Sequence, residues 1–261
     1  MFLKEYFRGI IEHRYILGSL IQRDLLAKYR RSKLGVAWAV LTPLGLAIII
    51  GAVYSILFNT SPAQLIPLIF ASINPWMFMS GTADGATMSF PAAEGYIKQS
   101  TVASQIFPLR TTVVNLVTLL YSMITFFGLY LFIAPEKFGP VMLLCVPGLL
   151  IMFIFTLGLA NLTSLINLFF RDFAPLQSLI FQGLFYATPI IYDPQVLADR
   201  GYAIAYEINP FFYMLEIVRR PMMGTIPETR YFYIAALIAL VVFLCGSFVQ
   251  VKFSKKIAYM L

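Results

Sequence analysis

The chain has 261 residues, of which 60% are hydrophobic and 12% are charged, and it carries a formal net charge of +7. Apolar runs of about 20 residues, each long enough to cross a bilayer as a helix, exclude a soluble domain with one large core as the main interpretation. Because the basic residues flank these runs and are not gathered into a stretch with interleaved aromatics, we expect them to contact anionic lipid headgroups and no nucleic acid.

Residues 2–12 form the most regular amphipathic helix of the sequence. Their apolar side chains fill one half of a helical wheel, and their charged side chains fill the other. The segment is too short and too charged to span a bilayer, so we expect it to lie flat on the cytoplasmic membrane surface. Packing against the protein's own spans is the alternative. Residues 1–33 together are predicted to be a cytoplasmic interface and coupling segment.

Residues 34–261 are predicted to form an all-α transmembrane domain of six helices. The expected spans are approximately 35–58, 65–90, 109–133, 141–170, 174–192 and 231–251. A basic cluster directly precedes the first span and places the N-terminus in the cytoplasm. Of the 19 lysines and arginines, this topology leaves five outside, which supports a cytoplasmic location for both chain ends; these five are Lys137, Arg200, Arg219, Arg220 and Arg230.

Polar residues interrupt two of the predicted spans. Asn74-Pro75 and the glycines around Asp84 are expected to break the second span, and such a break needs protein or water beside it. Asp84 is the only carboxylate within a predicted span, which makes it a functional candidate, although exposure to water near the cytoplasmic end explains it equally well. In the fifth span, Gln177 and Gln182 either line a polar path or bond between helices, and we favour bonding between helices.

Two connections between the predicted spans are more than simple loops. Residues 97–107 lie on the cytoplasmic side and are compatible with a short helix that ends at Pro108. Residues 193–230 lie outside and contain apolar and aromatic stretches that are too short to cross a bilayer. We expect them to form an external hairpin of short re-entrant or interfacial helices.

The sequence shows no enzymatic site. No Gly-Lys dipeptide occurs, so the chain has no GxxxxGKS/T loop to hold the phosphates of ATP. His13 is the only histidine, and Cys145 and Cys245 each lie inside an apolar run, which leaves no catalytic residue and no metal site to propose. A single intramembrane carboxylate also fits an ion-coupled transporter poorly. These features favour a pore that is moved by an external motor.

Several segments carry a resemblance to a known family. Residues 20–44, LIQRDLLAKYRRSKLGVAWAVLTPL, resemble the segment that opens the permease subunits of bacterial polysaccharide ABC exporters, which include the O-antigen and teichoic acid transporters. Further motifs of the family match in order: PWMF at 75–78, NLFFRD at 167–172, TPIIY at 188–192, and Asn209-Pro210 followed by Glu216, Arg219 and Gly224. One departure is that Lys98 is followed by QSTV, without the Phe-Pro of the family.

The resemblance implies a homodimer of this chain in the bacterial cytoplasmic membrane, joined to two copies of a separate cytoplasmic ABC ATPase. That partner would bind ATP and Mg²⁺, so no cofactor is expected in this chain. The substrate would be a lipid-linked glycan such as O-antigen. Closure of the ATPases is predicted to push on the segment before the first span and on a coupling helix at 97–107, through Arg23, Asp24, Lys28, Arg30, Lys98 and Gln99.

Aromatic faces suit sugar rings, so we predict that the channel is lined by Trp38, Tyr54, Trp76, Phe78, Tyr186 and Tyr192. Interfacial anchoring and packing are their alternative roles. Candidates to receive a lipid pyrophosphate at the cytoplasmic entrance are Arg30, Arg31 and Lys33, although positive-inside anchoring would place them there as well. Two rival functions stay open: an ABC permease for another lipid or for drugs, and a stand-alone protein such as an ion-coupled flippase or a lipid-modifying enzyme.

Overall fold

The computed structural model describes residues 2–30 and 32–261, and this part of the chain forms helices without any β-strand. The prediction of an all-α, multi-span membrane protein is confirmed. Five helical stretches are long and apolar enough to cross a bilayer, and they contain α3 (Trp38–Phe58), α4 (Pro62–Thr87), α6 (Ile106–Ile133), α7 (Cys145–Phe169) and most of α12 (Thr229–Met260). Short 3-10 turns are η1 (Gly35–Ala37), η2 (Pro91–Ala93), η3 (Pro135–Lys137) and η4 (Pro140–Leu144).

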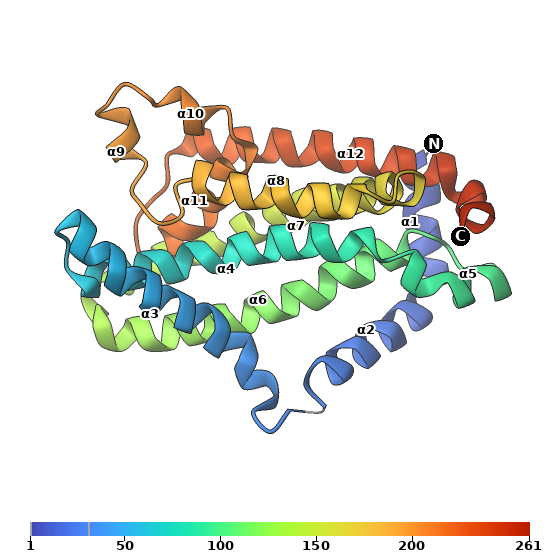
Figure 1. Ribbon diagram of the computed structural model, residues 1–261, viewed down its shortest axis with the longest axis horizontal. Helices are drawn as coiled ribbons and strands as arrows, with labels where there is room; N and C mark the ends of the chain where they lie inside the picture. Colours follow the sequence, from blue (N-terminus) through green and yellow to red (C-terminus); the bar gives the residue numbers. More distant parts are fainter. Residues whose placement is uncertain (1, 31) are drawn as a thin grey trace.

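The segment predicted as the fifth span, 174–192, forms a shorter helix, α8 (Phe173–Ala187). Its 15 residues extend about 22 Å, less than the hydrocarbon thickness of a bilayer. The helix ends at Ala187 because Thr188 adopts an extended conformation and Pro189 follows it. α8 lies beside α4 and runs in the opposite direction along the bundle (Figure 1).

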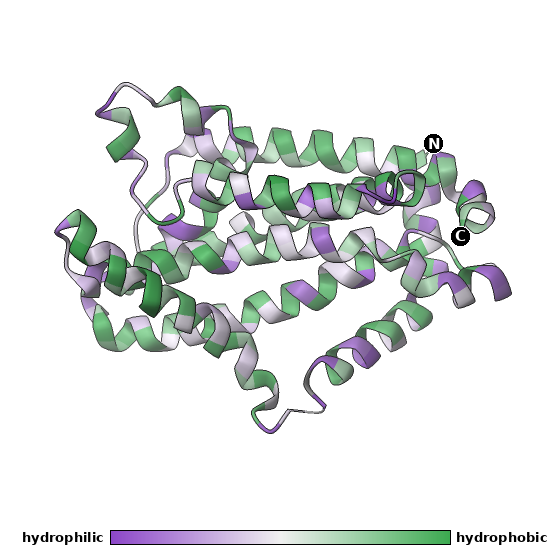
Figure 2. Cartoon of the chain, in the orientation of Figure 1, coloured by the Kyte–Doolittle hydropathy of each residue, from purple (hydrophilic) through white to green (hydrophobic). Residues whose placement is uncertain are grey.

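Both chain termini lie at one end of the helical bundle, which we call the basal end, and the opposite end is the distal end (Figure 1). α4 is the central helix, since 72% of its most apolar 18-residue stretch is buried, against 22% of the corresponding stretches in the spans that contain α3 and α12. The outer helices present mostly apolar residues, and strongly hydrophilic segments gather on α2 and near the C-terminus (Figure 2). This distribution suits a bundle that is surrounded by lipid along its length.

α4 is one continuous helix, so the expected breaks at Asn74-Pro75 and at the glycines around Asp84 are wrong. Polar side chains inside the helix bond to its own carbonyl groups: Ser72 Oγ donates to Leu68 O at 2.7 Å, and Asn74 Nδ2 donates to Phe70 O at 2.7 Å. Neighbouring helices pack on this part of α4, and such packing allows a proline in a membrane helix without ending it.

The first two helices, α1 (Phe2–Glu12) and α2 (Arg14–Tyr29), lie at the basal end (Figure 1). α1 has the predicted bounds, and its apolar face is divided: Tyr6 packs on the protein itself, which was the alternative interpretation, whereas Phe7 and Ile11 are exposed. Tyr6 is fully buried and accepts a hydrogen bond from Asn161 Nδ2 of α7 at 2.9 Å. Gln105 Nε2 donates to Tyr6 O at 3.1 Å, where the missing side chain of Gly9 leaves room for the amide.

The predicted helix at 97–107 is wrong. A shorter helix, α5 (Glu94–Gln99), ends where Ser100 becomes extended, and α6 already begins at Ile106. The reason is hydrophobic: Ile106 and Phe107 are fully buried in a cluster with Leu20 and Phe90. Pro108 lies in the first turn of α6, where its missing N–H breaks no helical hydrogen bond.

The segment between α8 and α12 contains α9 (Gln195–Ala198), α10 (Ile204–Glu207) and α11 (Pro210–Met222). α9 and α10 lie at the distal surface (Figure 1). α11 is buried from Phe211 to Arg219 and packs against α4, α7 and α12. Of the short helices in this segment, α9 and α10 thus lie at the surface, whereas nearly all side chains of α11 are withdrawn into the bundle.

Candidate functional site

A buried polar network joins three segments at the distal end of the bundle. Glu216 of α11 is fully buried and forms ion pairs with Arg219 and Arg220. Arg219 Nη1 also donates to Pro189 O at 2.6 Å and to Ser72 Oγ of α4 at 3.3 Å. Asn209 extends the network and caps α11. Its Oδ1 accepts a hydrogen bond from Phe211 N at 3.0 Å, and its Nδ2 donates to Thr188 Oγ1 at 2.8 Å.

We call this set of six residues the distal network: Ser72, Thr188, Pro189, Asn209, Glu216 and Arg219. Five of its members, all except Ser72, come from two separate sequence motifs. A buried charge is tolerated only when it is paired and hydrogen-bonded. The network therefore fixes the position of α11 against α4 and the turn after α8.

A hollow of about 530 Å³ lies between α4 and α8, and we call it the Asp84 hollow. Its polar lining residues are Ser80, Asp84, Ser178 and Gln182, and its aromatic ones include Trp76, Phe185 and Tyr186. Asp84 Oδ1 accepts hydrogen bonds from Gln177 Nε2 at 2.9 Å and from Ser178 Oγ at 3.3 Å. Gln177 thus bonds between helices, as favoured from the sequence, whereas the exposed Gln182 lines the hollow.

Asn167, from the NLFFRD motif, holds α8 against the basal end of α4. Its Nδ2 donates to Thr87 O at 2.9 Å, and its Oδ1 accepts from Ala174 N at 3.1 Å. One side chain therefore satisfies a free carbonyl at the end of α4 and a free N–H at the start of α8. This contact positions the basal end of the Asp84 hollow.

The six predicted channel aromatics are divided among separate places. Trp76 is buried, with edge-to-face contacts to Phe181, Phe185 and Phe211, while Tyr186 is 68% exposed beside it. Tyr54 packs on Phe58, and Tyr192 donates from its hydroxyl to Tyr186 O at 3.2 Å. Packing therefore accounts for Trp76, and exposure leaves Tyr186 as the aromatic of the Asp84 hollow that is most accessible to a ligand.

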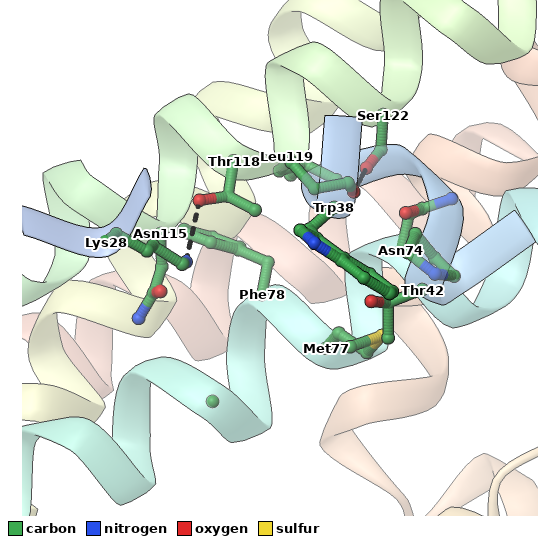
Figure 3. Close-up of a pocket in the computed structure, with 13 residues that line it drawn as sticks. Lys28, Trp38, Thr42, Asn74, Met77, Phe78, Asn115, Thr118, Leu119 and Ser122 are labelled. Carbon is green, nitrogen blue, oxygen red and sulfur yellow. Dashed lines mark hydrogen bonds between the residues drawn. The ribbon is translucent and has the colours of Figure 1, made fainter. Parts of the chain in front are cut away.

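Trp38 and Phe78 line a second pocket, of about 400 Å³, between α2, α3, α4 and α6 (Figure 3). The Trp38 ring lies between side chains of α4 and α6, and its Nε1 donates to Ser32 Oγ at 3.0 Å. Lys28 Nζ donates to Thr118 Oγ1 at 3.0 Å at the edge of this pocket, and partial burial lowers the pKa of Lys28 below its ordinary value. The pocket thus combines one cation, several amide and hydroxyl groups, and an exposed indole ring.

Charged residues connect α2 to α5 and α6 at the basal end. Arg110 Nε of α6 lies 3.0 Å from Asp24 Oδ2 of α2, and Arg110 is 8% exposed. Arg23 lies 3.4 Å from Asp24 and donates to the Tyr96 hydroxyl of α5 at 3.2 Å. We call Arg23, Asp24, Tyr96 and Arg110 the basal charge cluster. It brings together two of the predicted coupling residues and adds two that the sequence analysis did not select.

The other predicted basal residues do not join this cluster. Lys98 pairs with Glu94 within α5 at 2.6 Å, and hydrogen bonding to Lys98, followed by its charge, lowers the pKa of Glu94. Gln99 is exposed at the end of α5, and Arg30 and Lys33 are exposed near the start of the first span. Arg31, the remaining candidate for a lipid pyrophosphate, lies outside the described residues.

Some residues of these sites gave a sequence signal that was not used. Arg110 directly follows Pro108-Leu109 at the start of a predicted span, where an arginine needs a partner. Ser72 and Tyr96 gave no comparable signal, because their roles depend on contacts across 147 and 73 positions of the chain. Among the residues that the structure describes, no group of three or more His, Cys, Asp or Glu side chains could hold a metal ion.

The sequence profile of the ABC-2 type transporter family matches residues 15–223. A curated relative, the O-antigen export system permease protein RfbA of Myxococcus xanthus, is 28% identical over 208 residues, which cover 78% of each chain. A protein of the same name from Klebsiella pneumoniae is 24% identical over 233 residues, 88% of this chain and 89% of the relative, and a second one is 27% identical over 214 residues.

Proposed function

Because the chain belongs to the ABC-2 type transporter family, we propose that it is the membrane permease subunit of an ATP-driven exporter that moves a polysaccharide across the bacterial cytoplasmic membrane. The match over residues 15–223 is the observation that carries this proposal. It is supported by three relatives that are named O-antigen export permeases and align with 78–88% of the chain.

ATP hydrolysis belongs to a separate ABC ATPase in this proposal, since the chain has no phosphate-binding loop. The basal end offers the docking surface, because α2 and α5 expose charged side chains there and are connected by the contact between Arg23 and Tyr96. A force on either helix would reach α6 through Asp24 and Arg110. In this arrangement the basal end, with both chain termini, faces the cytoplasm.

A homodimer of this chain would enclose the glycan path. The Asp84 hollow contains a carboxylate and opens at the surface of the bundle, and contact between a charge and lipid tails is unfavourable. A second copy facing α4 and α8 would shield the hollow from lipid and leave a wet passage between the two chains. Tyr186 is the predicted channel aromatic that fits this passage best.

The lipid end of a lipid-linked glycan would meet the basic residues that precede the first span. Arg30 and Lys33 are exposed there, and the pocket of about 400 Å³ that Lys28 and Trp38 line lies beside them, between α2, α3, α4 and α6 (Figure 3). The cationic side chains attract the negative charge of a pyrophosphate group, and tryptophan rings are common at the membrane interface. Arg30, Arg31 and Lys33 therefore stay our candidates for this contact.

A deletion strain tests the function directly. Loss of this chain should remove the surface glycan and cause lipid-linked glycan to accumulate on the cytoplasmic side, and the parent gene should restore export. Inside-out membrane vesicles then distinguish the energy source. Uptake of lipid-linked glycan should require hydrolysable ATP and survive an uncoupler. Uptake driven by an ion gradient without ATP would contradict the proposal and favour an ion-coupled flippase.

A further inference from the structure

Two facing rows of side chains line the Asp84 hollow. On α4, Ser80 and Asp84 are four residues apart, and on α8, Ser178, Gln182 and Tyr186 repeat with the same spacing. Residues at this spacing share one face of a helix, and α4 and α8 run in opposite directions (Figure 1). The hollow is therefore polar towards the basal end, at Asp84 and Ser178, and aromatic towards the distal end, at Tyr186.

Asp84 has more capacity to accept hydrogen bonds than the protein uses. A carboxylate has about four acceptor positions, and the two bonds that Asp84 receives, from Gln177 and Ser178, both reach Oδ1. No described residue donates a hydrogen bond to Oδ2. Asp84 Oδ2 is thus available to accept a hydrogen bond from a ligand at the polar end of the hollow.

The lining selects against several classes of ligand. No lysine or arginine of the part of the chain that the structure describes lines the hollow, so a phosphate would be repelled by Asp84 without compensation. An acyl chain would remove water from the carboxylate at a large cost in free energy. A metal ion would find a single carboxylate, and no metal-binding cluster exists among the residues that the structure describes. A neutral molecule with several hydroxyl groups fits all of these conditions.

We propose that the Asp84 hollow binds sugar residues of the exported glycan. Asp84 accepts hydrogen bonds from sugar hydroxyls, Gln182 and Ser80 offer further polar contacts, and the exposed ring of Tyr186 covers the apolar face of a sugar. The hollow of about 530 Å³ lies within the range of about 300–1,000 Å³ that is typical of small-molecule sites. This inference rests on the proposed function, and it assigns to Asp84 the role of a sugar-binding residue.

Tryptophan fluorescence tests the site, because the chain has only two tryptophans. A Trp38→Phe background leaves Trp76, which lines the hollow, as the reporter. The purified full chain in lipid nanodiscs is titrated with free trisaccharides of mannose, galactose and glucose up to millimolar concentration. At least one of them should cause a saturable change in the emission of Trp76.

Variants in the same background identify the residues that bind. Asp84→Asn keeps the shape of the side chain and removes its charge, and it should weaken binding about tenfold or more. Tyr186→Ala should weaken binding several-fold. The matched control is Asp199→Asn, which removes an exposed carboxylate after α9, and it should bind like the background protein. If Asp84→Asn fails to fold, Tyr186→Ala and Gln182→Ala decide the question, since both change exposed side chains.

The proposal is overturned if no trisaccharide changes the emission of Trp76, or if every hollow variant binds like the background protein. Glycan export measured in vesicles separates this outcome from a failure of the proposed function. If the protein exports glycan with ATP but no sugar binds in the hollow, only the sugar-binding site is overturned. If the parent protein exports no glycan, the proposed export function is overturned, whatever the fluorescence shows.

Discussion

Arg219 of α11 donates a hydrogen bond to the main-chain carbonyl of Pro189, with 2.6 Å between Nη1 and O, and thereby joins α11 to the turn after α8. The same guanidinium pairs with the buried carboxylate of Glu216 and reaches Ser72 of α4. Arg219 therefore supplies a donor to the Pro189 carbonyl and shares with Arg220 the compensation of the buried Glu216 charge.

Arg219→Ala should destabilise the protein by about 3 kcal/mol or more, because it leaves Glu216 partly uncompensated and the Pro189 carbonyl without its donor. Arg219→Lys keeps the charge but cannot reproduce the planar set of donors, so its stability should lie between that of Arg219→Ala and that of the parent. Thermal unfolding in detergent measures the stability of both variants. Arg200→Ala, at an exposed distal position, is the control and should unfold like the parent. Equal melting temperatures for Arg219→Ala and Arg200→Ala would refute the prediction.

The contact between Asp24 and Arg110 should contribute a measurable coupling energy, because Arg110 is nearly buried. A double-mutant cycle with Asp24→Asn and Arg110→Gln should give about 0.5–2 kcal/mol from unfolding measurements. The same cycle for Arg8 and Glu12, which form an exposed pair on α1, should give a value near zero. Independent effects of Asp24 and Arg110 would mean that this pair does not hold α2 to α6.

Asp24→Asn should also lower glycan export more than it lowers binding of the ATPase, if force passes from α2 to α6 through this pair. The measurement compares ATP-dependent uptake in vesicles with the amount of ATPase that copurifies. Glu12→Gln removes a carboxylate from the exposed surface of α1 and is the matched control. A parallel loss of export and ATPase binding would instead assign Asp24 to the docking surface.

Local patterns predicted much of this fold. The bounds of α1 follow from its amphipathic period, and the long spans follow from apolar length. The error at 97–107 arose because Ile106 and Phe107 were assigned to a polar connection, whereas burial beside Leu20 and Phe90 moves them into α6. Hydropathy along the chain does not reveal a pocket that is formed by residues distant in sequence.

The candidate sites were predictable only in part for the same reason. Asp84 is visible as a carboxylate in an apolar run, but its partners Gln177 and Ser178 lie 93 and 94 positions away. Glu216 and Arg219 lie in the segment 193–230, which was predicted to be an external hairpin, and the structure buries both through mutual pairing. The sequence could not predict that pairing, because an exposed helix with the same i,i+3 spacing would look identical.

Tyr6→Phe should loosen α1, because it removes the hydroxyl that accepts a hydrogen bond from the buried amide of Asn161. The expected loss is about 1–3 kcal/mol, the cost of leaving a buried donor without a partner. Thermal unfolding near neutral pH measures it. Tyr15→Phe, which changes an exposed hydroxyl on α2, is the control and should have little effect.

The stabilising effect of Tyr6 should also depend on pH. Burial raises the pKa of Tyr6 to about 12, although the hydrogen bond from Asn161 opposes this effect. The folded state therefore keeps the proton when an unfolded tyrosine, with a pKa near 10, has lost it. The contribution of the hydroxyl should be complete below about pH 10 and decline towards pH 12. The difference in melting temperature between the parent and Tyr6→Phe should accordingly narrow from about pH 8 to about pH 11.5, and a constant difference would contradict the assignment.

Gly158→Ala should disrupt the contact between α7 and α12. An added Cβ at Gly158 would lie 2.6 Å from Phe243 Cα and 2.7 Å from Val242 C, so the two backbones would have to separate. Small residues allow such close helix packing in membrane proteins, and overpacking typically costs about 1–3 kcal/mol. Gly183→Ala is the matched control, since a Cβ at this position of α8 meets no atom within 4 Å and alanine favours a helix. Thermal unfolding should show a lower melting temperature for Gly158→Ala and an unchanged or higher one for Gly183→Ala; the opposite order would mean that α7 and α12 do not pack through Gly158.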